Sequence, residues 1–124
     1  MEKKQSFKSV RSFIGTNDFE ESRSFYKAFG FSEVVLSKDL SYFEIDEKLG
    51  FYLQKAFVKD WIENSMLFLE VENLETYLTE LKAKNLTAKF SNVRISEIVE
   101  NDWGKEFFLH DPSGILWHIG NFND

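Results

Sequence analysis

The stretch Ser12–Glu20, SFIGTNDFE, decides the fold because it returns in outline 55 positions later as Leu67–Glu75, LFLEVENLE. Few residues are identical, but the physical roles follow in the same order. Each stretch opens with apolar residues typical of a strand. Each then reaches Asp18 or Asn73, whose side chain can accept hydrogen bonds from the free N–H groups of a helix start. The repeat predicts one structural unit used twice.

The residues after each capping position predict an amphipathic helix. Leu74, Leu78 and Leu81 fall at helical spacing, so the second helix has an apolar stripe, and the first helix has a weaker one. Gly30 and Asn85 then stand where a left-handed residue ends a helix. Both helices are therefore expected to pack one face against the rest of the protein.

Shorter apolar runs after each helix predict the remaining strands. In the first half these are residues 31–37, 41–46 and 49–54; in the second half they are a strand somewhere in 86–100, then 105–110 and 115–119. The segment Asp111–Gly114, DPSG, is a strong turn signal that should close a hairpin between the last two strands.

The fold that follows is α+β, with two βαβββ modules at about 7–54 and 66–119. Residues 55–65 connect the modules, and the whole chain, 1–124, is expected to form one domain. The mixed sheets should curl around a shared cleft, with the helices on the outside. Such a cleft is a natural site for a small ligand.

Composition narrows the classes of function. The net charge is −6 and no cluster of Lys and Arg is present, which argues against nucleic-acid binding. No apolar run is long enough to span a membrane, no signal peptide is recognisable, and no cysteine is present, so we expect a cytoplasmic protein. The acidity suits a cationic small molecule, although it also serves solubility alone.

Four segments resemble the vicinal-oxygen-chelate superfamily, also called the glyoxalase/bleomycin-resistance/dioxygenase group. They are Asn17–Asp18, Ser24–Tyr26, Gly30–Phe31 and Phe107–Gly114. The resemblance covers nearly the whole chain and implies the fold described above. It leaves the function open, because the superfamily contains both metal enzymes and metal-free binding proteins.

The metal enzymes of this superfamily place ligands at four points, which the resemblance maps onto Arg11, Gln54, Met66 and His118. Arginine offers no lone pair to a metal ion, and a thioether is too soft for the usual iron, nickel or zinc. Gln54 is a weak ligand, which leaves His118 as the one good donor. We therefore expect no metal and no other cofactor.

The segment 96–107, SEIVENDWGKEF, resembles bleomycin-resistance proteins more specifically. Those proteins carry out no chemistry. The resemblance implies a homodimer that holds two drug molecules in crevices at the subunit interface. Aromatic rings stack on the flat part of the drug, and acidic groups receive its cationic tail.

Seven residues are the expected ligand contacts, and no catalytic residue is expected. They are Trp103, Phe68, Phe31, Gln54, Trp61, Glu106 and His118. By resemblance Trp103 is the stacking ring, Phe68 a second ring, Phe31 an aromatic at the start of the second strand, and Gln54 a small polar contact. Five of them have a plainer interpretation. Trp103 and Phe68 could belong to the core, and Trp61 could simply dock the connecting segment onto the body. Glu106 could be solvated, and His118 could be a hydrogen-bonded histidine that binds nothing.

The function expected from the sequence is a protein that sequesters a cationic aromatic antibiotic of the bleomycin type without modifying it. Phe68 and Val35 offer less aromatic surface than the best-known members do, so the identity of the drug stays open. Two alternatives remain. One is a divergent metal-dependent glyoxalase or dioxygenase, and the other is a binder of some other small metabolite.

Overall fold

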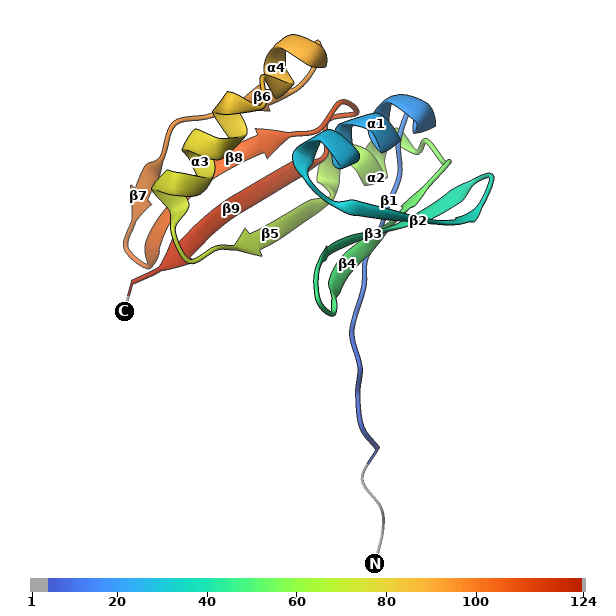
Figure 1. Cartoon of the computed structure of the whole chain (residues 1–124), viewed down its shortest axis with the longest axis horizontal. Coiled ribbons are helices and arrows are strands. Elements are labelled where there is room, and N and C mark those ends of the chain that lie inside the picture. The colour runs from blue at the N-terminus through green and yellow to red at the C-terminus, as the bar shows by residue number, and fades with distance from the viewer. Residues whose placement is uncertain (1–4, 124) are drawn as a thin grey trace, which may run out of the picture.

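The computed structural model describes residues 5–123 and contains two modules of similar topology (Figure 1). The termini of the predicted domain, residues 1–4 and 124, lie outside the described residues. The first module consists of β1 (Phe13–Ile14), α1 (Phe19–Phe29), β2 (Ser32–Ser37), β3 (Leu40–Asp46) and β4 (Leu49–Gln54). The second consists of β5 (Met66–Glu70), α3 (Leu74–Ala83), α4 (Leu86–Lys89), β6 (Arg94–Ile95), β7 (Val99–Asn101), β8 (Gly104–His110) and β9 (Leu116–Phe122).

Each module folds into its own curled mixed sheet, as the sequence predicted. The N-terminal sheet has the order β1-β4-β3-β2, and the C-terminal sheet has the order β5-β9-β8-β6, with β7 also paired to β8. In both sheets the first strand runs parallel to the last strand of its module, and the other pairs are antiparallel. The α+β fold of two repeated modules is confirmed.

The helix starts and ends lie where the sequence placed them. Asp18 accepts a hydrogen bond from the backbone N–H of Glu21 at 3.0 Å, and Asn73 accepts one from Thr76 at 3.1 Å. Gly30 ends α1 with φ of 122°, a value that favours glycine because it has no Cβ. The hydrogen bonds to Asp18 and Asn73 satisfy N–H groups that the first turn of each helix leaves free.

The regions between the regular elements hold more helix than expected. Residues 55–65 contain a short helix, α2 (Lys59–Asn64), which buries Ile62 in the core. Residues 86–101 contain α4 and the two short strands β6 and β7, where the sequence predicted one strand within 86–100. No helix within residues 5–123 is long and apolar enough to cross a membrane.

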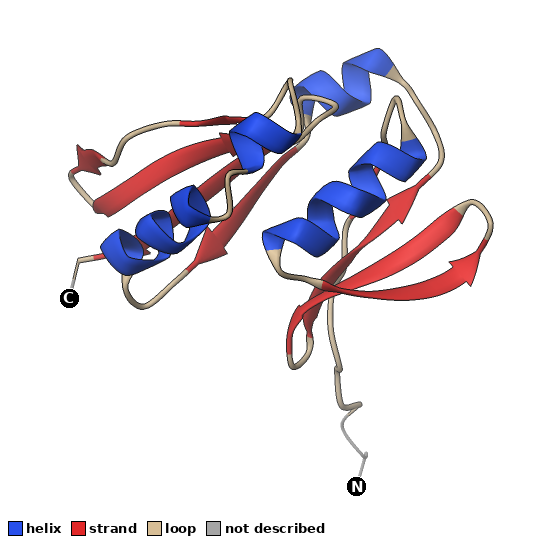
Figure 2. Cartoon of the chain, turned by 45° about the horizontal axis from the view of Figure 1, so that its top comes forward, coloured by secondary structure: helices blue, strands red, loops and turns tan. Residues whose placement is uncertain are grey.

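Helices α1 and α3 cover the same side of their respective sheets (Figure 2). Their buried residues and the covered sheet faces join in one core that extends through both modules. We call the opposite, uncovered face of each sheet its outer face. In the N-terminal sheet, for example, Phe51 and Leu53 are buried, whereas Tyr52 between them is partly exposed.

A buried hydrogen-bond network ties the modules together. The Tyr26 hydroxyl of α1 donates to Asp111 Oδ2 at 2.6 Å and accepts from Trp117 Nε1 at 3.0 Å. Asp111 Oδ1 accepts from the backbone N–H groups of Ser113, Gly114 and Ile115, each at 2.9 Å. Burial raises the pKa of Asp111, and these hydrogen bonds oppose that shift. The predicted DPSG turn is thus also an anchor between the two halves.

Candidate functional site

Three aromatic side chains, Phe68, Trp103 and Phe122, gather at one end of the outer face of the C-terminal sheet. Their ring centroids are 5.8 Å apart for Phe68 and Trp103, 5.0 Å for Trp103 and Phe122, and 5.7 Å for Phe68 and Phe122. All three are exposed, by 45%, 36% and 54% respectively. A surface group of large aromatic residues marks an interaction site more often than a packing site. We call this group the aromatic cluster.

Backbone features help to position two residues of the aromatic cluster, Trp103 and Phe68. Trp103 lies in the two-residue turn between β7 and β8, and its carbonyl accepts from the backbone N–H of Asn123 at 2.8 Å. Phe68 lies over Gly120 of β9, where a Cβ would come within 3.2 Å of Phe68 Cζ. Gly120 therefore leaves the space that the Phe68 ring occupies.

A polar network borders the aromatic cluster on the same face. The Glu106 carboxylate lies 2.8 Å from His118 Nδ1 and accepts from Asn101 Nδ2 at 2.8 Å. Glu106 is 8% exposed, and its carboxylate can only accept, so it selects the form of His118 that carries a proton on Nδ1. His118 Nε2 then faces Met66 Sδ at 3.3 Å, and the imidazole ring is stacked on Phe68 at 6.4 Å.

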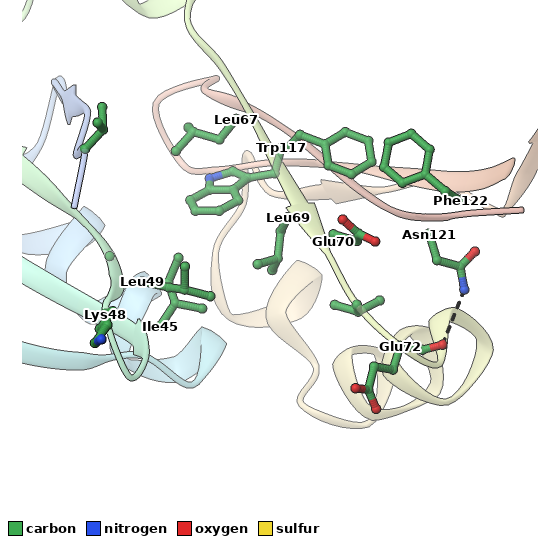
Figure 3. Close-up of a pocket in the computed structure, with 14 residues that line it drawn as sticks. Ile45, Lys48, Leu49, Leu67, Leu69, Glu70, Glu72, Trp117, Asn121 and Phe122 are labelled. Carbon is green, nitrogen blue, oxygen red and sulfur yellow. Dashed lines mark hydrogen bonds between the residues drawn. The ribbon is translucent and has the colours of Figure 1, made fainter. Parts of the chain in front are cut away.

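A groove of about 820 Å³ lies between the two modules (Figure 3). The β3–β4 hairpin forms one wall with Ile45 and Leu49, and strands β5 and β9 form the other. Phe68 and Phe122 belong to the aromatic cluster and also line this groove, so the groove and the cluster are continuous.

The same groove carries negative charge. The lining includes Glu70, the last residue of β5, and Glu72, two residues after it. It also includes Asn121, whose Nδ2 donates to the Glu72 carbonyl at 3.4 Å (Figure 3). Lys48 lies on the hairpin wall. A lining that combines apolar side chains with two carboxylates and one lysine suits an aromatic molecule that carries a cationic group.

The structure brings together four of the seven residues that the sequence singled out: Trp103, Phe68, Glu106 and His118. Phe31 lies in the core instead, 7% exposed, with its ring stacked on Phe29 at 4.6 Å. Trp61 is on α2, 63% exposed, and Gln54 is at the end of β4 in the other module. Phe122 was missed, although it continues the alternation of His118 and Gly120 along β9.

Strand pairing revises one of the four positions that the resemblance to the metal enzymes assigned, namely Gln54. Phe13 pairs with Tyr52, and Phe68 pairs with His118, so Tyr52 is the counterpart of His118 in the first module. Gln54 lies two residues further along β4.

The contacts follow the same symmetry. In the first module, Arg11 Nη1 donates to Tyr52 Oη at 3.1 Å. The equivalent contact in the second module is the one between Met66 Sδ and His118 Nε2. Arginine, a phenol and a thioether do not fit a catalytic metal site with a single imidazole. Within residues 5–123, no group of three or more His, Cys, Asp or Glu residues is arranged to hold a metal ion.

Comparison with known proteins gives a clear result for the fold. No protein-family model matches the sequence, and no curated protein matches it. Among solved structures, the bleomycin-binding protein from Streptomyces verticillus, complexed with copper(II)-bleomycin, is similar with a TM-score of 0.80 at 17% identity, covering 97% of this chain and all of that one.

Two further structures show the range of proteins with this architecture. A bleomycin resistance determinant encoded on the transposon Tn5 has a TM-score of 0.75 at 17% identity, covering 94% of this chain and 99% of that one. Lactoylglutathione lyase from Agrobacterium tumefaciens has a TM-score of 0.68 at 13% identity, covering 94% and 96%. The chain therefore has the glyoxalase/bleomycin-resistance/dioxygenase fold, which binding proteins and enzymes share.

Proposed function

We propose that this chain is a metal-free binding protein that sequesters a cationic aromatic antibiotic of the bleomycin type without modifying it. The observation that carries the proposal is the exposed aromatic cluster of Phe68, Trp103 and Phe122. It offers flat apolar surface at the edge of a groove that carries two carboxylates. The fold is that of proteins that bind bleomycin.

In the proposed complex, a planar heteroaromatic part of the drug stacks against the aromatic cluster. Each well-placed aromatic pair contributes about 0.5–1.5 kcal/mol beyond the burial of its area. Glu70 and Glu72 attract the cationic part, which raises the association rate and the specificity more than the affinity. The His118–Glu106 pair supplies a polar contact beside Phe68.

The proposal includes a homodimer in the cytoplasm, with the drug held in a crevice that both subunits line. The outer faces support a shared crevice because both expose large apolar side chains, such as Phe13 on one sheet and Phe68 on the other. Sedimentation should give a dimer at micromolar concentration. A monomer at that concentration would remove the shared crevice from the proposal.

A paired tryptophan experiment tests the site. Trp103→Ala should raise the dissociation constant for bleomycin by roughly 30-fold, equivalent to about 2 kcal/mol, because a stacked indole is a typical hot spot. Trp61→Ala is the matched control, since Trp61 is also exposed but is on α2 and outside the aromatic cluster. Binding would be followed by isothermal titration calorimetry, because Trp103→Ala removes the fluorophore that is proposed to face the drug. Equal affinities for the two variants would refute the assignment.

An enzymatic role is the second candidate, because a lactoylglutathione lyase shares the fold. The donor set of Arg11, Tyr52, Met66 and His118 argues against it. Elemental analysis of protein purified without chelators decides between the two. A stoichiometric transition metal would favour the enzyme, and its absence would favour the binding protein.

A further inference from the structure

A row of side chains crosses the outer face of the N-terminal sheet and contacts one arginine. Strand register places Phe13, Tyr52, Tyr42 and Val34 side by side, one from each strand. Phe13 and Tyr52 are stacked, with ring centroids 4.5 Å apart and planes 20° from parallel. Phe13 is 55% exposed, so one face of its ring remains available.

Arg11 is held over this row by two tyrosines. Its guanidinium carbon lies 4.3 Å from the Tyr42 ring centroid and 5.8 Å from that of Tyr52. Nη1 also donates to Tyr52 Oη at 3.1 Å. Stacking on an aromatic face leaves the guanidinium edge free for planar recognition of an anion.

The charge of Arg11 has no partner among residues 5–123, where no carboxylate lies within 4.0 Å of it. This is unexpected in a chain with a net charge of −6. Arg23, by contrast, pairs with both Glu20 and Glu33. A guanidinium has five N–H donors in a fork that matches a carboxylate, and Tyr52 uses one of them.

We propose that Arg11 and the exposed ring of Phe13 form an anion-selective aromatic subsite, which binds a carboxylate or phenolate attached to a planar ring. Arg11 and Phe13 are two residues apart on one face, about 7 Å between Cα atoms in an extended chain. A ring stacked on Phe13 can therefore direct its acidic group to the free edge of Arg11. This inference rests on the proposed binding function and adds an anionic group to the ligand class.

A pair of probes that differ by one charge tests the subsite. Anthraquinone-2-carboxylate and anthraquinone-2-carboxamide have the same rings, and calorimetric titration gives a dissociation constant for each. The native protein should bind the carboxylate about tenfold more tightly than the amide, because one charge-assisted bidentate contact contributes about that much to affinity. Arg11→Gln should reduce that ratio to about one, and Arg11→Lys, which keeps the charge and loses the fork, should give an intermediate ratio.

Lys8→Gln is the matched control because it removes the same charge from an exposed residue three positions away, and it should leave the ratio unchanged. A native ratio near one, or a ratio that survives Arg11→Gln, overturns the inference. The inference is also overturned if Arg11→Gln weakens the dimer and leaves the ratio unaltered, because Arg11 would then bind a second copy of the chain instead of a ligand. If bleomycin binding depends on Trp103 but the two probes bind equally well, only this subsite is refuted. If the carboxylate probe binds about tenfold more tightly but bleomycin does not bind, only the proposed function is refuted.

Discussion

Glu106→Gln isolates the contribution of the network beside the aromatic cluster. The change keeps the size of the side chain and removes its charge. Glu106 accepts from His118 Nδ1 and from Asn101 Nδ2, both at 2.8 Å. An amide has one accepting oxygen and one donating nitrogen, so it cannot accept from both partners at once. His118 must move its proton to Nε2 for both contacts to survive.

The expected cost of Glu106→Gln is about 1–2 kcal/mol in the free energy of unfolding. Hydrogen bonds to a charged group contribute about 1.5–3 kcal/mol each, and neutral ones about 0.5–1.5 kcal/mol. The amide therefore keeps part of both contacts. Glu106→Ala should cost more, about 3 kcal/mol, because it leaves two partly buried donors without an acceptor.

Urea denaturation measures these free energies, and nitrogen NMR of His118 reports which ring nitrogen carries the proton. Glu100→Gln on the neighbouring strand β7 is the control, since Glu100 is exposed and should change stability by less than about 0.5 kcal/mol. The reasoning fails if Glu106→Gln is as mild as Glu100→Gln, or if His118 protonates Nε2 already in the native protein.

Two further predictions concern the core and the edge of the N-terminal sheet. Tyr26→Phe should lower the free energy of unfolding by about 2–3 kcal/mol, since it leaves the Trp117 N–H and an Asp111 oxygen buried without a partner; a loss below about 0.5 kcal/mol in urea denaturation would contradict this. The hydrogen bond from Arg23 lowers the pKa of Glu33 from its ordinary value of 4.5. The ionised Glu33 therefore stabilises the folded protein above pH 4.5, and this stabilisation is lost as the pH falls below 4.5. Denaturation between about pH 5 and pH 3 should show this loss in the native protein and a smaller one in Glu33→Gln, and identical slopes would refute it.

Most of the fold could be predicted from the sequence because local signals agree with the global arrangement. Asp18, Asn73 and Gly30 mark the ends of helices by backbone chemistry that depends on few neighbours. Residues 86–100 were harder to predict. Short segments there are held mainly by tertiary contacts, such as the hydrogen bond from the backbone N–H of Ser96 to the Phe108 carbonyl.

The candidate site could be predicted only in part. Trp103 was identified because the segment 96–107 resembles bleomycin-resistance proteins, in which a tryptophan at this position stacks on the drug. The sequence does not fix strand register, so Tyr52 was overlooked in favour of Gln54, two residues away on the same face. Phe31 was expected in the cleft, but burial depends on how the two modules pack, and Phe29 and Trp117 enclose it. That Arg11 has no carboxylate partner among residues 5–123 likewise becomes visible only in three dimensions.

Equilibrium dialysis of the purified protein against bleomycin, followed by mass spectrometry of the recovered drug, tests the central claim most directly. The proposed function predicts saturable binding that approaches one drug molecule per chain, and a recovered drug of unchanged mass. Absence of saturable binding, or a drug recovered with an altered mass, would contradict it.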